Sequence, residues 1–234
     1  MHRKCLPVLL ITTLGLSVGS LFGAVTLPSW HGQPNTTSQV FQFTTGSTTP
    51  GPNSSSNPYG TATGVVDQGA VGNGWEDPNA QFSNPGHDGD GSWDVGLGSD
   101  GSLRFNVPVA PGTLAPGQSY RIDIMIFAHV FVSLAQPPVP SVDGLAPGDL
   151  VLENQGVLST YGMTGATWQY RTWTGTLEDY ESGAITVALT PPNGAVSAID
   201  RVEIYTQYTL VPEPTAPILT LIPLAAWCLR RRRR

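Results

Sequence analysis

The sequence predicts an all-β protein, and an antiparallel β-sandwich of the jelly-roll kind fits it best. Apolar and polar residues alternate with a period of two, as in strands with one buried face. The clearest segments are residues 102–107, 121–126, 185–189 and 202–208. Among the chain's 27 glycines and 21 prolines, several pairs favour turns between such segments, at residues 110–112, 115–117, 146–148 and 191–194. No comparable segment shows helical spacing, so we expect about 8 to 10 strands.

The body of the chain opens with residues 25–56, which are rich in Thr, Ser, Pro, Gly and Asn. We expect one short strand there, at residues 40–44, and otherwise a solvated loop, although an adhesive or glycosylated stalk has a similar composition. The β-sandwich domain is then expected to span residues 57–210. Within it, the apolar run 120–134 is long for one strand and should bend, cross the sandwich or be broken by a bulge near His129.

The first 24 residues have the layout of a secretory signal peptide. A short basic region, residues 1–4, precedes an apolar stretch at 6–22, and Gly23-Ala24 provides a cleavage site. Cys5 precedes the apolar stretch, which is the wrong geometry for a lipoprotein. The alternative is a permanent N-terminal transmembrane helix. We expect a cleaved signal peptide at residues 1–24 and therefore an exported protein.

The last 24 residues contain three parts in a fixed order. A rigid tripeptide, Pro212-Glu213-Pro214, precedes the nearly uncharged residues 215–229, and five arginines end the chain. A bilayer core of ~30 Å needs ~20 helical residues, whereas 15 residues cover about 22 Å. Pro217 and Pro223 each lack an amide donor and weaken the span further. We expect a single, marginal transmembrane helix at 215–229 that holds the protein only transiently.

The arginines also fix the orientation of this span. Basic residues beside an apolar helix stay on the cytoplasmic side, which leaves everything before Val211 outside the cytoplasm. Two alternatives are an ordinary tail anchor and a buried apolar strand followed by a basic solubility tag. A buried strand would not need five terminal charges, so the membrane interpretation is preferred.

The three-part order of residues 212–234 resembles the PEP-CTERM sorting domain of Gram-negative bacteria that make extracellular polysaccharide. The resemblance implies recognition by an exosortase, a transpeptidase-like membrane enzyme, with processing near the tripeptide and release or transfer to the cell surface. The partners implied are the exosortase, the secretion machinery and, transiently, the inner membrane. The sorting residues, which act as substrate, are Pro212, Glu213, Pro214, Arg230, Arg231, Arg232, Arg233 and Arg234.

Outside the two targeting segments the chain is strongly acidic. Its four basic residues are all arginines and stand against 16 acidic residues before Val211, which gives a net charge near −12. Such a surface repels phosphate backbones, so we expect no nucleic-acid partner. Both cysteines, Cys5 and Cys228, lie in the targeting segments. The exported body therefore has no disulfide and must be held together by packing, or by packing and a metal.

Short motifs of the body give a second resemblance, to exported jelly-roll proteins of environmental bacteria that carry the same sorting domain. The resemblance covers about residues 57–210 and implies a galactose-binding-like sandwich, without assigning a ligand. The motifs are residues 74–77, 91–96, 101–103 and 199–204.

One glycine-rich loop suggests a structural calcium ion, and no other cofactor is expected. Side-chain oxygens recur there at alternate positions, and calcium takes six to eight oxygen ligands. They belong to Asp88, Asp90, Ser92 and Asp94. An EF-hand is excluded because Trp93 and Ser99 stand where glycine and glutamate are required. The alternative is a solvated acidic turn that leads into a strand.

Three aromatic residues, Trp168, Tyr170 and Trp173, lie within six positions. Exposed on one face of a strand, they would form a platform on which sugar rings stack. Trp168 and Tyr170 share a face at strand spacing, and Trp173 joins them only across a bulge. The alternative is that they are ordinary core residues of the sandwich.

Together these features predict a non-catalytic, exported protein of the cell envelope or extracellular matrix. A carbohydrate-binding module of the exopolysaccharide matrix is one alternative, and a polysaccharide-cleaving enzyme is another. A glycosidase needs two carboxylates facing each other across a cleft. The candidates for such a pair are Glu76, Asp77, Glu178, Asp179 and Glu181. Acids this numerous occur on any surface of this charge, and no motif of a nucleophile, phosphate loop or zinc protease is present.

Overall fold

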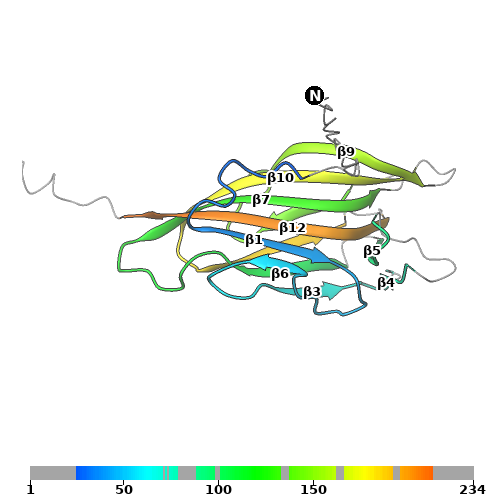
Figure 1. The fold of residues 1–234 in the computed structure, drawn as a ribbon, viewed down its shortest axis with the longest axis horizontal. Helices are drawn as coiled ribbons and strands as arrows, with labels where there is room; N and C mark the ends of the chain where they lie inside the picture. Colours follow the sequence, from blue (N-terminus) through cyan, green and yellow to red (C-terminus); the bar gives the residue numbers. More distant parts are fainter. Residues whose placement is uncertain are drawn as a thin grey trace, which may run out of the picture.

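The structure is a computed structural model that describes residues 25–70, 72, 74–78, 88–97, 101–132, 137–161, 166–191 and 196–212. In this part the chain folds into twelve β-strands and no helix (Figure 1). The strands are β1 (Thr36–Gln42), β2 (Ser54–Ser56), β3 (Thr63–Asp67), β4 (Gly74–Glu76), β5 (Ser92–Leu97), β6 (Ser102–Pro108), β7 (Ser119–Val132), β8 (Val139–Val142), β9 (Val151–Tyr161), β10 (Ala166–Tyr180), β11 (Ala184–Thr190) and β12 (Val196–Val211). The all-β prediction is confirmed.

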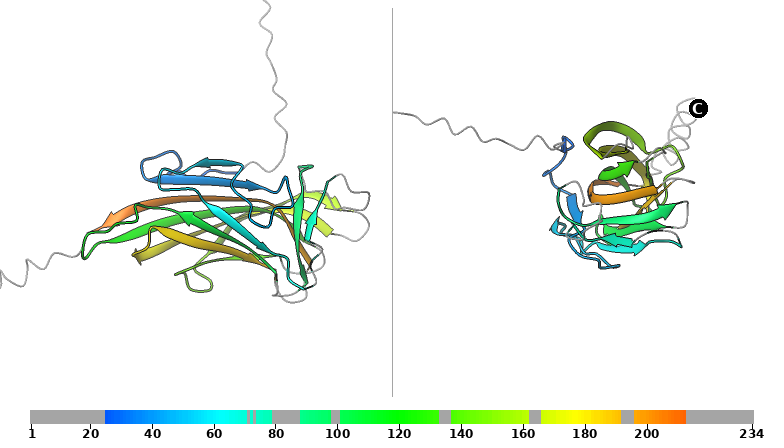
Figure 2. Two further views of the ribbon diagram at one scale, coloured as in Figure 1. Left: turned by 90° about the horizontal axis from the view of Figure 1, so that it is seen from below. Right: turned by 90° about the vertical axis from the view of Figure 1, so that its right-hand side faces the viewer.

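The strands form two antiparallel sheets that lie face to face (Figures 1 and 2). The larger has the order β2-β1-β12-β7-β10-β9, and β5, which also pairs with β4, joins it at β12. The smaller has the order β3-β6-β11-β8. The first and last strands of the described chain, β1 and β12, are neighbours over their whole common length. The larger sheet is therefore completed only by the last strand of the body.

A single hydrophobic core lies between the two sheets. The residues whose alternation predicted strands all point into it, among them Phe105, Ile126 and Val187, which have essentially no exposed surface. Phe41 of β1 meets Phe105 of β6 across the core, with ring centroids 4.4 Å apart. Because side chains alternate along a strand, this burial also fixes the register of each strand.

The long strand β7 runs along the larger sheet without a break. The length of its apolar run predicts a bend, a crossing of the sandwich or a bulge near His129. The irregularity is found instead in its partner β12, whose register shifts between Ile199 and Arg201, opposite His129. Asp200 is the extra residue of this bulge.

The sandwich begins earlier than predicted, because β1 and β2 both lie before residue 57 and belong to the larger sheet. The boundary between a Thr/Ser/Pro/Gly-rich segment at 25–56 and a domain at 57–210 is therefore corrected. The strand was expected only at 40–44 because Thr37 and Gln39 interrupt its apolar pattern. Both are buried, and the Thr37 hydroxyl is hydrogen-bonded to that of Thr206 at 2.7 Å.

Two of the predicted turns are formed as expected. Gly117 and Gly148 have φ angles of 76° and 100°, values that glycine adopts without steric cost. Backbone hydrogen bonds close the turns, from the amide of Gln118 to the carbonyl of Ala115 and from Asp149 to Ala146, each at 3.1 Å. Both turns lie in connections between the two sheets, from β6 to β7 and from β8 to β9.

The two targeting segments lie outside the described residues. These are the predicted signal peptide, residues 1–24, and the tail after Pro212, including the predicted membrane span at 215–229. Within the described part, no helix has the length and apolar character needed to cross a bilayer. Both segments stay predictions from sequence.

The packing of Phe41 against Phe105 predicts a measurable coupling between the sheets. Each change to leucine should lower the free energy of unfolding by about 1–2 kcal/mol. The double variant should lose less than the sum by about 0.5–1.5 kcal/mol, because the first change already removes the ring contact. Urea denaturation of the four proteins measures this coupling. Val65→Ala, at a side chain that is 54% exposed, is the control and should be additive with either change.

Candidate functional site

The end of the sandwich from which the tail departs is the first candidate site. β12 ends at Val211, and Pro212, the first residue of the predicted sorting tripeptide, follows with an exposed side chain. A shallow hollow of about 280 Å³ adjoins this point. It is lined by Gly117, Gln118, Ser119, Asp179, Glu181, Val211 and Pro212. The other predicted sorting residues, Glu213, Pro214 and Arg230–Arg234, lie outside the described residues.

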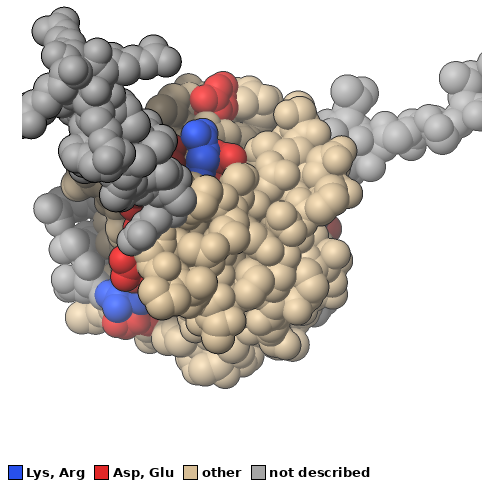
Figure 3. Space-filling model, turned by 90° about the vertical axis from the view of Figure 1, so that its left-hand side faces the viewer, with Lys and Arg blue, Asp and Glu red and all other residues tan. Residues whose placement is uncertain are grey.

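Charged side chains at this end lie close to one another, as seen in Figure 3. Arg121 contacts Asp123 at 3.5 Å and Glu178 at 3.3 Å, with all three side chains substantially exposed. The Ser119 hydroxyl donates to the carboxylate of Asp179 at 3.3 Å. Exposed ion pairs of this kind add little stability. They leave an acidic surface beside the start of the tail.

Three tyrosines pack together at the end of the core from which the tail departs. The ring of Tyr208 makes edge contacts with Tyr59 and Tyr120, at centroid distances of 5.5 and 5.3 Å. Burial raises the pKa of Tyr59 to about 12, and its hydrogen bond and electrostatic interaction with Tyr208 add to the shift. The pKa of Tyr120 is raised mainly by burial, and its hydroxyl donates to the carbonyl of Pro111.

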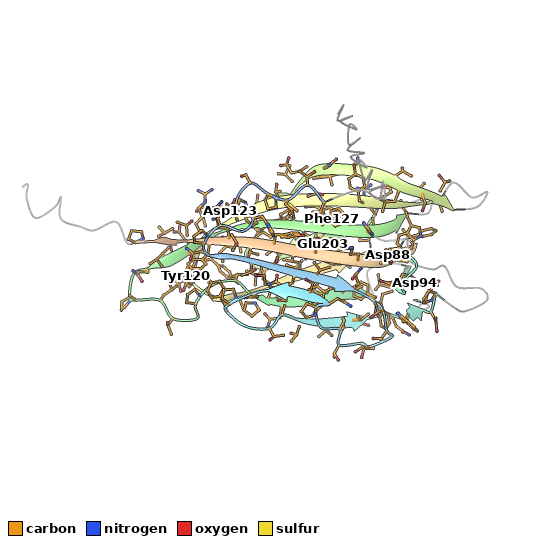
Figure 4. All side chains as sticks on the ribbon, viewed as in Figure 1. Asp88, Asp94, Tyr120, Asp123, Phe127 and Glu203 are labelled. Atoms are coloured by element: carbon orange, nitrogen blue, oxygen red, sulfur yellow. The ribbon has the colours of Figure 1, made fainter. Side chains whose placement is uncertain are left out.

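A buried ionic network crosses the outer face of the larger sheet. Glu203 of β12 is only 2% exposed, and one of its carboxylate oxygens lies 2.6 Å from Nε of Arg201. The other oxygen accepts a hydrogen bond from the hydroxyl of Tyr205, whose pKa is raised mainly by burial. Beside them, Nδ1 of His129 is 3.4 Å from the carboxylate of Asp200. Figure 4 shows Glu203 beside Phe127 of β7 near the middle of this sheet.

The segment before β1 covers part of this network. The His31 ring packs edge-on against Tyr205 at 5.4 Å, and the carbonyl of Asn35 accepts from the amide of Tyr208 at 3.1 Å. Farther along, residues 26–28 border a hollow of about 380 Å³ with Met125, Glu153, Asn154, Thr172 and Thr174. Removing one partner of a buried ion pair is costly, because it leaves the other charge buried and uncompensated.

The predicted calcium loop lies at the end of the sandwich opposite the start of the tail (Figure 4). Asp88 is exposed and caps the amide of Asp90 at 3.1 Å, whereas Asp94 is buried in β5 and caps the amide of Gly96 at 2.9 Å. Ser92 is fully buried. The pKa of Asp90 is raised by burial and then by Asp88. Among the described residues no group of three or more His, Cys, Asp or Glu side chains could hold a metal ion, and the calcium site stays a prediction.

The structure does not bring the three aromatic residues together on one exposed face. Trp168 is 3% exposed and packs against Phe131 at 5.3 Å, in a small cluster on the outer face of β10. Tyr170 lies on that outer face, half-buried and stacked 6.2 Å from Phe127. Trp173 is 4% exposed and points into the main core. This arrangement matches the alternative that they are core residues, and it offers no stacking platform.

The acidic residues considered for a glycosidase lie at two ends of the molecule. Glu76 and Asp77 adjoin β4, which reaches β12 through β5 near Ile199. Glu178, Asp179 and Glu181 lie at the end of β10, near Ser119 and the last residues of β12. No pair drawn from both groups can therefore face each other across one cleft, as a glycosidase requires.

The ionic network was not predicted, although the sequence contains one signal for it. The motif at residues 199–204 places Arg201 and Glu203 two positions apart, which sets them on one face of a strand. Two charges on the same face of a mostly apolar strand indicate a covered ion pair. The bulge at Asp200, which brings its carboxylate to His129, has no sequence signature of its own.

Comparison with known proteins yields no match: no family model, no curated protein and no solved structure is similar to this chain.

The tyrosine cluster predicts a loss of stability at high pH. A phenol normally ionises near pH 10.0, so in the unfolded chain Tyr59 loses its proton first, and stability falls between pH 10.0 and about 12. Below pH 10.0 this decline in stability is absent, because Tyr59 is protonated in both the folded and the unfolded chain. Tyr59→Phe should make this decline shallower, as measured by urea midpoints from neutral to alkaline pH. An equally steep decline in the variant would show that Tyr59 is not responsible.

Proposed function

We propose that this protein is an exported, non-catalytic component of the cell envelope or extracellular matrix, sorted by an exosortase through its C-terminal tail. The observation on which this depends is that the body ends where the sorting signal begins. β12 is paired with β7 up to Val211, and Pro212 emerges exposed immediately after it. Processing at the tripeptide would therefore break no pair of the sheet and open no part of the core.

The position of β12 gives the tail a second property that suits sorting. β12 lies between β1 and β7, in the interior of the larger sheet. A pull on the tail is thus resisted by hydrogen bonds on both sides of the strand. A marginal membrane span can hold such a body outside the cytoplasm, and the arginines orient it, until the exosortase acts.

The body has properties expected of a protein that works outside the cytoplasm. It lacks cysteine and lysine and has a net charge near −12. High net charge favours solubility and opposes non-specific association with other acidic polymers. The described surface contains shallow hollows and no cleft with facing carboxylates, which supports a binding or structural role over a catalytic one.

We also propose the jelly-roll topology for the sandwich. The larger sheet contains the order β1-β12-β7-β10, and the smaller contains β6-β11-β8 opposite it. If β1, β6, β7 and β8 are taken as the first strands of a jelly roll and β10, β11 and β12 as the last, the two groups alternate in both sheets, as in a pair of Greek keys. β9 departs from a symmetric arrangement, since it pairs with β10 in the larger sheet. A galactose-binding-like sandwich is consistent with this order.

Changes in the tail test the sorting proposal. Replacing Arg230–Arg234 by serine removes the orientation signal, so the protein should pass through the membrane uncut. Replacing Pro212-Glu213-Pro214 by alanine should instead leave it membrane-held and full length. Mass spectrometry of surface, membrane and medium fractions, in a host that has an exosortase, distinguishes these products.

The matched control is Asp67→Ala, at an exposed position of β3 near β5 and thus at the opposite end of the sandwich from the tail, which should be sorted and cut like the wild type. The proposal is contradicted if the surface form of the wild-type protein still contains Arg234. In that case the tail is only an anchor.

A further inference from the structure

The larger sheet extends beyond the smaller one on the side of β10 and β9, as the end-on view in Figure 2 shows. On the inner face of β10, the side nearer the tail is covered: Trp173 is buried, and Gly175 is packed against Leu145 and Leu150. Farther along the strand, Thr167, Gln169 and Arg171 are only half-buried. The cover therefore ends near Trp173 and leaves an open inner surface, here called the shelf.

The neighbouring strand β9 extends the shelf. In an antiparallel pair, directly opposite residues point to the same face. Gln155 lies opposite Arg171, Val157 opposite Gln169, and Thr160 opposite Thr167. These three β9 side chains are exposed, Val157 to 61%. Glu153, the one acidic residue of β9, binds Thr174 on the other face of the sheet. The shelf thus consists of amides, hydroxyls, one valine and one guanidinium, with no carboxylate.

Hydrogen bonds hold the polar groups of the shelf in a row. The Gln169 amide donates to the Thr167 hydroxyl at 2.9 Å, and Nη2 of Arg171 donates to the carbonyl oxygen of Gln169 at 2.9 Å. These bonds use one donor of a guanidinium that has five. Nε of Arg171 is buried and has no hydrogen-bond partner in the described structure. Arg171 is therefore positioned with donors to spare.

The absence of a carboxylate is unusual for this chain. Of its four body arginines, Arg121 and Arg201 pair with acids, and Arg104 is exposed to solvent on β6. Arg171 is half-buried and, within the described residues, has no acid within ion-pair distance. Burial lowers its pKa, which reflects a charge that is partly desolvated and not compensated. In a body with a net charge near −12, the shelf is a local site of opposite character.

We propose that the shelf binds an acidic polysaccharide, with Arg171 receiving the carboxylate of a uronic acid residue. A guanidinium binds a carboxylate through two parallel hydrogen bonds, and half-burial strengthens them. Gln155, Gln169 and the two threonines supply donors and acceptors for sugar hydroxyls. Val157 provides a small apolar surface for a sugar ring. The proposal depends on the exported location for its biological meaning, since the polymer lies outside the cell.

A binding assay with a defined probe tests the proposal. The probe is a galacturonic acid hexamer, and its fully methyl-esterified form is the uncharged control of equal length. The protein is the full chain, in detergent, with Arg230–Arg234 changed to serine throughout, because the arginine run would itself attract the anionic probe. Calorimetric titration at low salt should detect the charged hexamer, with the esterified hexamer bound about tenfold more weakly or not at all.

Variants then locate the site. Arg171→Gln should weaken binding of the charged hexamer by about tenfold or more, because it removes both the positive charge and the paired N–H donors of the guanidinium. The matched control Arg104→Gln, which removes an equal charge from β6, should stay within about twofold. Val157→Asp changes an exposed side chain, so the protein should fold normally, and its new carboxylate should repel the probe. Circular dichroism melting curves verify the folding of each variant.

The proposal is overturned if the wild type does not bind the charged hexamer, if both hexamers bind equally, or if Arg171→Gln and Val157→Asp bind it as the wild type does. Displacement of the hexamer by sodium acetate at equal concentration of carboxylate would also overturn it, since the site would then recognise charge alone. None of these outcomes depends on processing of the tail. Failure of this proposal is thus distinguishable from failure of the sorting proposal.

Discussion

The pairing of β12 with both β1 and β7 is the interaction on which the rest of the structure depends. β12 joins β1, the first described strand of the sandwich, to the long strand β7 and also pairs with β5. Because the body has no disulfide, these hydrogen bonds and the core beneath them are what hold the larger sheet together. The sheet therefore cannot be completed until the last residues of the body are available. The proposed sorting signal, which follows β12, would then be presented on a body that has all its strands.

Much of this fold was predictable because burial imposes a simple rule on strands. Where one face is buried and the other solvated, apolar residues recur at every second position, as at Phe105, Ile126 and Val187. The rule fails where polar residues are buried, which is why β1, with Thr37 and Gln39 facing the core, was underestimated. It also cannot tell which strand of a pair takes a bulge. The irregularity beside His129 belongs to β12, whereas the length of β7 suggested otherwise.

Of the candidate sites, the tail was predictable from sequence and the shelf was not. The tail could be proposed as a sorting signal from sequence alone, because its three parts form a linear pattern that needs no tertiary contact to define it. The shelf is not legible, because its character depends on where the smaller sheet stops covering β10 and on which β9 residues lie opposite Arg171. Trp168 and Trp173 illustrate the converse. Their spacing suggested a platform, but neighbouring strands and core packing bury them on opposite faces of β10.

The central claim is that the body is complete at the end of β12 and does not need the tail. Thermal unfolding of two truncated chains, both starting at Val25, tests it most directly. A chain ending at Pro212 should show the same β-sheet circular dichroism and the same single cooperative transition as the full-length protein. A chain ending at Ala195, which lacks β12, should show neither, because β1 and β7 lose their common neighbour. Cooperative unfolding of the chain ending at Ala195, or its absence in the chain ending at Pro212, would contradict the account.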